Sequence, residues 1–139
     1  MKTWQTLTCA ALLSTAAAAH ADNEVFVYLT SDSLQTQGMA MVLANQMQQQ
    51  GASVSVLLCD GAGDMAIKQH ESEALQPLNA SPAQLMQRLM QGGASVEVCA
   101  LYLPNKPATA DALIEGVTAA KPPQIAGKML DPAVKVFSF

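Results

Sequence analysis

Short runs of consecutive apolar residues alternate along this chain with segments in which apolar residues recur at helical spacing. The first run, 25–29, is typical of a strand buried on both faces of a parallel sheet. Apolar positions then recur at helical spacing as far as Gly51 and predict a helix over 34–50. A second apolar run, 54–58, predicts the second strand.

The second half of the chain continues this alternation. Ser81 followed by Pro82 predicts a helix start, because serine caps a helix and proline is tolerated at its first position. We expect that helix to end at Gly92. The other predicted elements are a short helix with an irregular continuation (65–75), a third strand (96–101), a short helix (109–114), a weak strand (116–119), a helix (122–130) and a last strand (134–137).

This order of elements predicts an α/β fold. Strands that alternate with helices through short connections favour a mainly parallel sheet with helices on both faces. We therefore expect residues 22–139 to form one domain with a flavodoxin-like open sheet of five strands in the order 2-1-3-4-5. Ligands of such sheets bind beyond the carboxyl ends of the strands, so the candidate ligand-binding residues lie in the loops there. They are Ser31, Asp32, Asp60, Gly61, Gly63, Asp64 and Asn105.

The N-terminal residues 1–21 are typical of a cleavable secretory signal peptide. Lys2 gives a positive start, an apolar stretch follows over 7–19, and Ala19 and Ala21 supply the small residues that a signal peptidase requires. The apolar stretch of about 13 residues is too short to span a bilayer, which takes roughly 20. We therefore expect an exported protein, periplasmic in a Gram-negative source, that has lost Cys9.

Composition excludes several function classes. Half of the residues are hydrophobic, 13% are charged and the formal net charge is −4, so the chain is globular, and neither nucleic acid nor an anionic membrane surface is an expected partner. Only His70 remains after cleavage, which leaves too few histidines for a multi-histidine metal site or a Cys/His catalytic pair. No nucleotide-binding glycine motif is present, and no cofactor is expected.

Cys59 and Cys99 are the candidate reactive residues. Cys59 follows the second strand directly, where Gly61 and Gly63 would let the backbone approach a ligand. Cys99 lies near the end of the third strand. Either cysteine is also compatible with a small buried apolar residue, because free cysteine is among the most buried residue types.

The expected strand order bears on whether the two cysteines can pair. In the order 2-1-3 the first strand lies between them, so two strand spacings of about 4.8 Å place their backbones roughly 10 Å apart. A disulfide needs Cα atoms within about 7 Å. We therefore expect two separate thiols.

Several segments together resemble the DsrE/DsrF-like family over nearly all of 25–139. They are 56–64, Ser81-Pro82, 92–99 and 103–105, of which the Gly-x-x-Val-x-Val-Cys segment that ends at Cys99 is the most specific. The resemblance implies a small flavodoxin-like sheet, assembly as a trimer or hexamer, and a persulfide carried on the cysteine after the third strand. By that resemblance Cys99 is the sulfur-carrying thiol, whereas Cys59 has no such general role. In the leading function below, Cys59 is auxiliary or structural.

Three functions follow as expectations. The leading one is an exported sulfur-handling or thiol-redox carrier that uses Cys99 and exchanges sulfur with a partner protein, since a carrier needs a nucleophilic thiolate and a second protein to remove the sulfur. The alternative is a non-catalytic oligomeric module that binds a ligand or partner and keeps its cysteines in the core. The third is binding of a soft metal such as cuprous copper by the thiolates and methionines.

Overall fold

The computed structural model describes residues 23–139. The expected signal peptide, 1–21, and Cys9 within it lie outside the described residues. Within 23–139, no helix is both long enough and apolar enough to cross a membrane.

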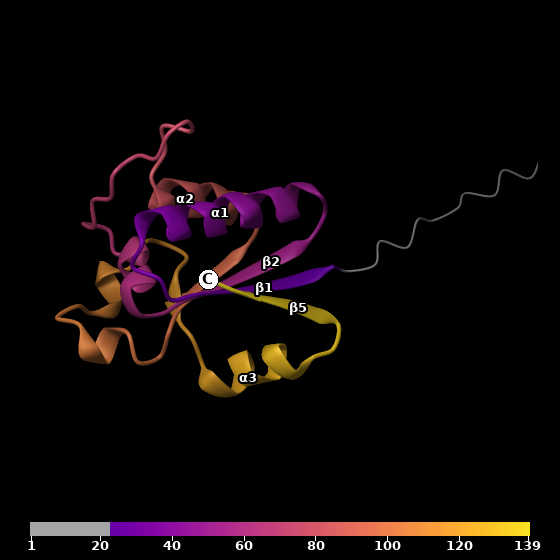
Figure 1. The fold of residues 1–139 in the computed structure, drawn as a ribbon. Coiled ribbons are helices and arrows are strands. Elements are labelled where there is room, and N and C mark those ends of the chain that lie inside the picture. Colours follow the sequence, from indigo (N-terminus) through magenta and orange to yellow (C-terminus); the bar gives the residue numbers. More distant parts are fainter. Residues whose placement is uncertain (1–22) are drawn as a thin grey trace, which may run out of the picture.

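The described chain alternates strands with helices in the predicted order (Figure 1). The elements are β1 (Glu24–Leu29), α1 (Leu34–Gln49), β2 (Ser53–Leu58), the 3₁₀-helix η1 (Asp60–Ala66), α2 (Pro82–Gln91), β3 (Ser95–Val98), the 3₁₀-helices η2 (Leu103–Asn105) and η3 (Ala110–Ala112), β4 (Thr118–Ala119), α3 (Pro122–Leu130) and β5 (Val134–Ser138). The α/β class, the strands and the three α-helices are therefore confirmed.

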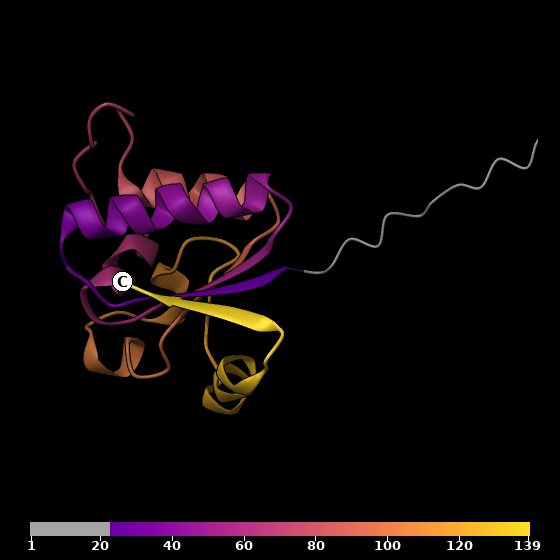
Figure 2. The same ribbon diagram turned by 45° about the vertical axis from the view of Figure 1, so that its right-hand side comes forward.

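All five strands are parallel, but their order differs from the expected one. The order is β4-β3-β2-β1-β5, so β2 lies beside β3, and β1 lies between β2 and β5. The predicted order 2-1-3-4-5 is wrong because the connections through α1 and α2 both run over the same face and add strands in one direction. Only α3 crosses the opposite face and returns the chain to the far side of β1 (Figures 1 and 2).

Local capping fixes where α1 and α2 begin. The Ser33 hydroxyl accepts from the Thr36 amide at the start of α1. At the start of α2, Ser81 and Gln84 form a reciprocal capping box with distances of 3.3 and 2.9 Å, and Pro82 occupies the first helical position. These contacts satisfy amide groups that the first helical turn leaves without partners.

The two faces of the sheet carry separate clusters of buried side chains. On the α1 and α2 face, Val27, Leu58 and Val98 belong to the large core. On the α3 face, the smaller cluster consists of Phe26, Leu57, Cys59, Ala120 and Ile125. Strand alternation produces this division, since successive side chains point to opposite faces.

Three predicted elements differ in extent. Helical structure within 65–75 is limited to the end of η1, and the expected helix 109–114 is only η3, where the Thr109 side chain makes no capping hydrogen bond. The third strand ends at Val98 rather than at residue 101. Cys99 is therefore the first residue beyond the strand, where side chains are less completely covered.

Candidate functional site

Cys59 and Cys99 lie side by side at the carboxyl edge of the sheet. Leu58 and Val98 are partners in the β2–β3 register, and each cysteine is the next residue along its chain. The ladder continues one step past the strands, because the Cys59 amide donates to the Leu29 carbonyl at 2.9 Å and the Cys99 amide donates to the Leu58 carbonyl at 2.8 Å. The two cysteines therefore occupy adjacent lateral positions.

This placement corrects the expected separation of the thiols. With β2 beside β3, one strand spacing of about 4.8 Å separates the backbones instead of two. That spacing falls within the Cα range of a disulfide. Both cysteines are free thiols in the structure, Cys59 buried and Cys99 partly exposed.

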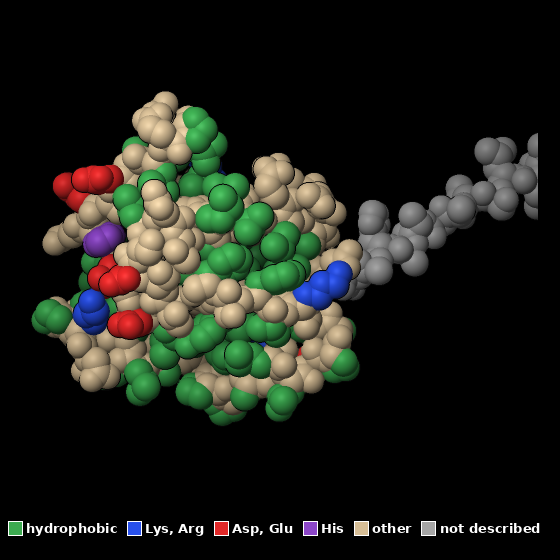
Figure 3. Space-filling view, in the orientation of Figure 1, with side chains coloured by type: hydrophobic (Ala, Val, Ile, Leu, Met, Phe, Trp, Pro, Cys, Tyr) green, Lys and Arg blue, Asp and Glu red, His purple; other side chains and the backbone are tan. Residues whose placement is uncertain are grey.

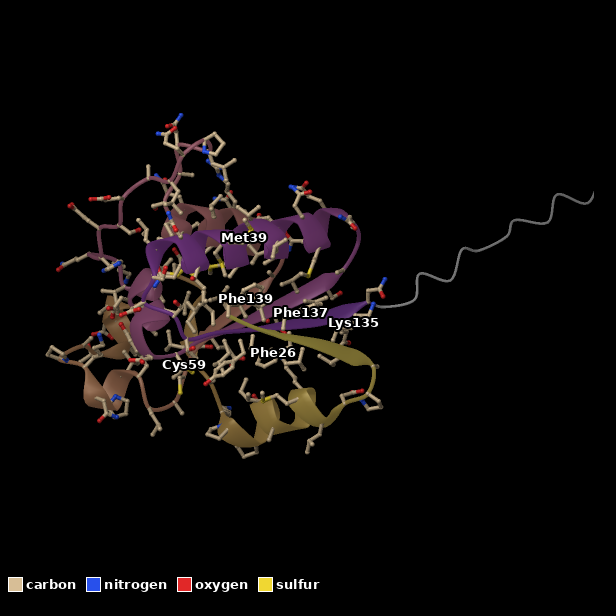
Figure 4. The ribbon with its side chains drawn as sticks, in the orientation of Figure 1. Phe26, Met39, Cys59, Lys135, Phe137 and Phe139 are labelled. Carbon is tan, nitrogen blue, oxygen red and sulfur yellow. The ribbon has the colours of Figure 1, made fainter. Side chains whose placement is uncertain are left out.

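The two thiols and a tyrosine form a row of neighbouring side chains. Cys99 and Tyr28 both act on the Cys59 thiol and change its pKa. Tyr28 reaches this row because it lies on the α3 side of β1, where Phe26 also points. Figure 4 shows Cys59 and Phe26 on the side of the sheet that faces α3, whereas Met39 lies on the α1 side.

Burial is the main influence on the protonation of the Cys59 thiol. Burial, the hydrogen bond to Cys99 and the charges of Cys99 and Asp60 raise the pKa of Cys59 to about 12, against a smaller lowering effect from Tyr28. Burial and the neighbouring Cys59 also raise the pKa of Tyr28. Cys59 is consequently protonated at neutral pH and acts as a hydrogen-bond donor. Because thiolates are the nucleophiles, the partly exposed Cys99 is the better placed of the two thiols to react first with an incoming molecule.

A second polar cluster holds the loop that follows Cys99. Asp64 of η1 accepts from the Tyr102 hydroxyl at 2.5 Å and from the Lys106 ammonium group at 2.8 Å. The Tyr102 amide donates to the Cys99 carbonyl at 2.8 Å, so this loop turns directly after the cysteine. Burial alone would raise the pKa of Asp64, but the hydrogen bonds from Lys106 and Tyr102 outweigh it and lower that pKa.

Gly63 makes this arrangement possible. A Cβ atom at Gly63 would lie 2.4 Å from carbons of the Tyr102 ring, so any larger residue would displace the ring. Lys106 also lies over the same ring, with its Nζ 5.5 Å from the ring centre. The Gly-rich loop after β2 thus packs against the loop after β3.

The chain is similar in structure to two solved proteins. One is MTH1491 from Methanobacterium thermoautotrophicum, a protein of unknown function, with a TM-score of 0.63 and 13% identity over 85% of this chain and 100% of that one. The other is the ychN protein of E. coli, with a TM-score of 0.64 and 18% identity over 85% of this chain and 99% of that one. The sequence matches no family model and no curated protein.

These similarities establish the fold. The shared five-stranded parallel α/β architecture agrees with the flavodoxin-like, DsrE-like fold that the sequence resemblance implies. At these identities they carry no activity over to this chain.

The other predicted loop residues have different surroundings. Asp32 packs against Gly61, where a Cβ atom would lie 2.5 Å from the aspartate Cβ, and this contact joins the loops after β1 and β2. The exposed Asp60 has a φ of 50° and acts on the Cys59 thiol through its charge. Ser31 and Asn105 make short-range contacts within their own loops, to the Ser33 amide at 3.1 Å and the Leu101 carbonyl at 2.8 Å.

Sequence reasoning missed Tyr28, Tyr102 and Lys106. Tyr28 could have been found from alternation, since it shares a strand face with Phe26. Tyr102 and Lys106 carry no such signal, because residues 99–106 leave the strand and form turns and the 3₁₀-helix η2.

The described residues contain no cluster of the histidine, cysteine, aspartate or glutamate side chains that commonly bind metal ions. Within 23–139, no group of three or more histidine, cysteine, aspartate or glutamate side chains could hold one. The paired thiols are soft ligands, but no third residue of these types joins them, and His70 is exposed. The copper alternative also draws on methionine ligands and stays a prediction.

Proposed function

We propose that this chain is an exported carrier of sulfane sulfur that holds the sulfur on Cys99 and exchanges it with partner proteins. The observation that carries the proposal is the pairing of a partly exposed Cys99 with a buried, protonated Cys59 at the carboxyl edge of the sheet. The resemblance around Cys99 supports the same residue. Membership of the DsrE/DsrF-like family and export through residues 1–21 are parts of this proposal.

The transfer reaction is balanced without an added oxidant. The Cys99 thiolate attacks the outer sulfur of a donor persulfide, which forms a bond between Cys99 Sγ and that sulfur. The sulfur–sulfur bond of the donor breaks, and the donor leaves as a thiolate. The reverse reaction with an acceptor thiol returns Cys99 to its starting state.

Intact mass spectrometry tests this function. The purified protein is treated briefly with a low-molecular-weight persulfide, quenched in acid and weighed without reductant. We expect the wild type and Cys59→Ser to gain one sulfur atom that a reductant removes, whereas Cys99→Ser gains none. Equal loading of Cys99→Ser and the wild type would refute the assignment. The same spectrum of exported protein reports cleavage after Ala21.

A second candidate is an oligomeric binding module, and one surface favours it. Figure 3 shows hydrophobic side chains gathered between α1 and the edge strand β5. An open, mostly apolar groove of about 710 Å³ lies on this side, with Met39, Leu78 and Phe139 among its lining residues. Met39 and Phe137 are 54% and 39% exposed. An apolar patch of this kind is typical of an interaction surface.

We propose a homo-oligomer, a trimer or hexamer, as the assembly that covers this patch. Light scattering of the purified protein should then give a mass above that of a single chain. The Phe137→Lys variant should lower that mass, while Lys135→Glu, on the same strand and face, serves as a control for altered charge. A wild type that is monomeric at high concentration would contradict the assembly.

A further inference from the structure

The adjacency of Cys59 and Cys99 has a chemical consequence for a sulfur carried on Cys99. Cys59 and Cys99 hold neighbouring positions directly after β2 and β3, and both backbones are held by the same parallel ladder. An incoming partner can reach the partly exposed Cys99, but Cys59 is only 7% exposed. Cys59 is therefore a nucleophile that only Cys99, and not a partner protein, is placed to meet.

We infer that Cys59 is a resolving thiol that attacks the Cys99 persulfide and releases the carried sulfur as hydrosulfide. This inference rests on the proposed carrier function and adds a second outcome to it. A loaded carrier either passes its sulfur to an acceptor thiol or discharges it within its own chain. The second route leaves an intramolecular disulfide.

The atoms and electrons of this step balance within the loaded protein. Cys59 loses its proton and its sulfur attacks Cys99 Sγ, the inner sulfur of the persulfide. A bond forms between the two cysteine sulfurs, the bond from Cys99 Sγ to the outer sulfur breaks, and hydrosulfide leaves. The sulfane sulfur gains two electrons, and the two cysteine sulfurs give them up. A dithiol reductant then restores the free thiols by thiol–disulfide exchange.

The backbone spacing of the two cysteines falls within the range of disulfides. Adjacent positions on neighbouring parallel strands lie about 4.8 Å apart, inside the Cα range of disulfides. The β2–β3 register runs from Ser55 opposite Ser95 to Leu58 opposite Val98, so the cysteines approach each other without a shift of either strand. The exit of hydrosulfide needs no channel, because the outer sulfur sits on the partly exposed Cys99.

Protonation of Cys59 makes this discharge slow at neutral pH. Attack requires the thiolate, and burial raises the pKa of Cys59 to about 12. The groups that act on this thiol are Cys99, Tyr28 and Asp60. On the same side of the sheet, β3 contributes Glu97, and α3 contributes Lys128, whose Nζ lies 5.9 Å from the Phe26 ring centre. Release of sulfide should therefore rise about tenfold per pH unit below that pKa.

Time-resolved loading tests the inference. Wild type and Cys59→Ser are loaded with the persulfide, desalted and incubated at several pH values. Intact mass and free sulfide are then followed together. We expect the wild type to lose its extra sulfur, release one sulfide per chain and end two hydrogens lighter than the reduced protein. Peptide mapping without reductant should then find Cys59 joined to Cys99. Cys59→Ser should keep its sulfur.

A matched control distinguishes loss of the Cys59 thiol from a change in the packing around it. Ala120→Ser places a hydroxyl in the same buried cluster and leaves both thiols intact, so it should discharge like the wild type. If the wild type keeps its sulfur as long as Cys59→Ser does, the inference is wrong while the carrier function stands. If Cys99 never loads in any variant, both are wrong. Sulfide release without a Cys59–Cys99 disulfide also overturns the inference.

Discussion

The two faces of the sheet differ in what they bury. Two helices cover one face, and the core beneath them contains many fully buried side chains such as Leu58, Met86 and Leu89. One nine-residue helix, α3, covers the other face, and its cluster of five residues includes Cys59. The comparison indicates that the first face supplies most of the stability, whereas the second holds the two candidate thiols at its carboxyl edge.

The difference arises because successive side chains of each strand point to opposite faces of the sheet. Along β1, Val25, Val27 and Leu29 point to the two-helix face, while Phe26 and Tyr28 point to the α3 face. On the second face, the short helix leaves the sheet edge partly open, which gives a thiol both a buried partner and access to solvent.

Leu89→Ala should have the largest effect on stability. Leu89 is 0% exposed in the two-helix core, so its truncation removes apolar contacts and leaves a cavity. We expect a loss of about 2–5 kcal/mol in the free energy of unfolding, measured with urea. Sulfur loading of the surviving folded protein should be unchanged. A loss below about 1 kcal/mol would break the proposed division between the faces.

Ile125→Ala should sharpen the comparison from the other side. Ile125 is 8% exposed and is the residue of α3 that belongs to the Cys59 cluster. We expect a smaller loss of about 2 kcal/mol, together with faster alkylation of Cys59 in the native protein. Met129→Ala, an exposed position on the same helix, is the control and should alter neither quantity. Alkylation of Cys59 at the wild-type rate would contradict the covering role of α3.

Asp64→Asn, at the carboxyl edge of the sheet, should have the smallest effect on the free energy of unfolding. The carboxylate bonds Tyr102 and Lys106, but it is 34% exposed, so we expect a loss of at most about 1 kcal/mol at neutral pH. Because its pKa is lowered in the folded state, its contribution is present above the unfolded value of about 3.9 and is lost as the pH falls. Urea unfolding from about pH 5 to pH 3 should therefore bring the wild type toward the variant. A constant difference across that range would contradict the role of the charge.

The helices and strands could be predicted from the sequence, but the order of the strands in the sheet could not. Within 23–139, apolar runs, helical spacing and the start signals at Ser81 and Pro122 located the α-helices and strands, because burial and capping are local. The order of strands depends on which face each connection crosses, which the pattern around residues 59–81 does not encode. The error separated Cys59 from Cys99 by a whole strand, and so it concealed the pairing on which the proposed chemistry depends.

The candidate site could be predicted only in part, because some of its contacts depend on the folded arrangement and not on local sequence. Strand ends identified both cysteines and the Asp60 to Asp64 loop as candidates. The contacts of Tyr102 and Lys106 with Asp64 depend on a turn after Cys99 that begins three residues earlier than expected. Long-range contacts of this kind follow from the folded arrangement and have no local sequence signal.

Native alkylation kinetics test the central claim most directly. The reduced wild type is treated with iodoacetamide at neutral pH, samples are quenched over time, and each cysteine is quantified from its own peptide. We expect Cys99 to be modified in the folded protein, whereas Cys59 should react much more slowly and be modified readily only after unfolding. A Cys99 that also remains unmodified until the protein unfolds would show that both thiols are core residues and would contradict the account.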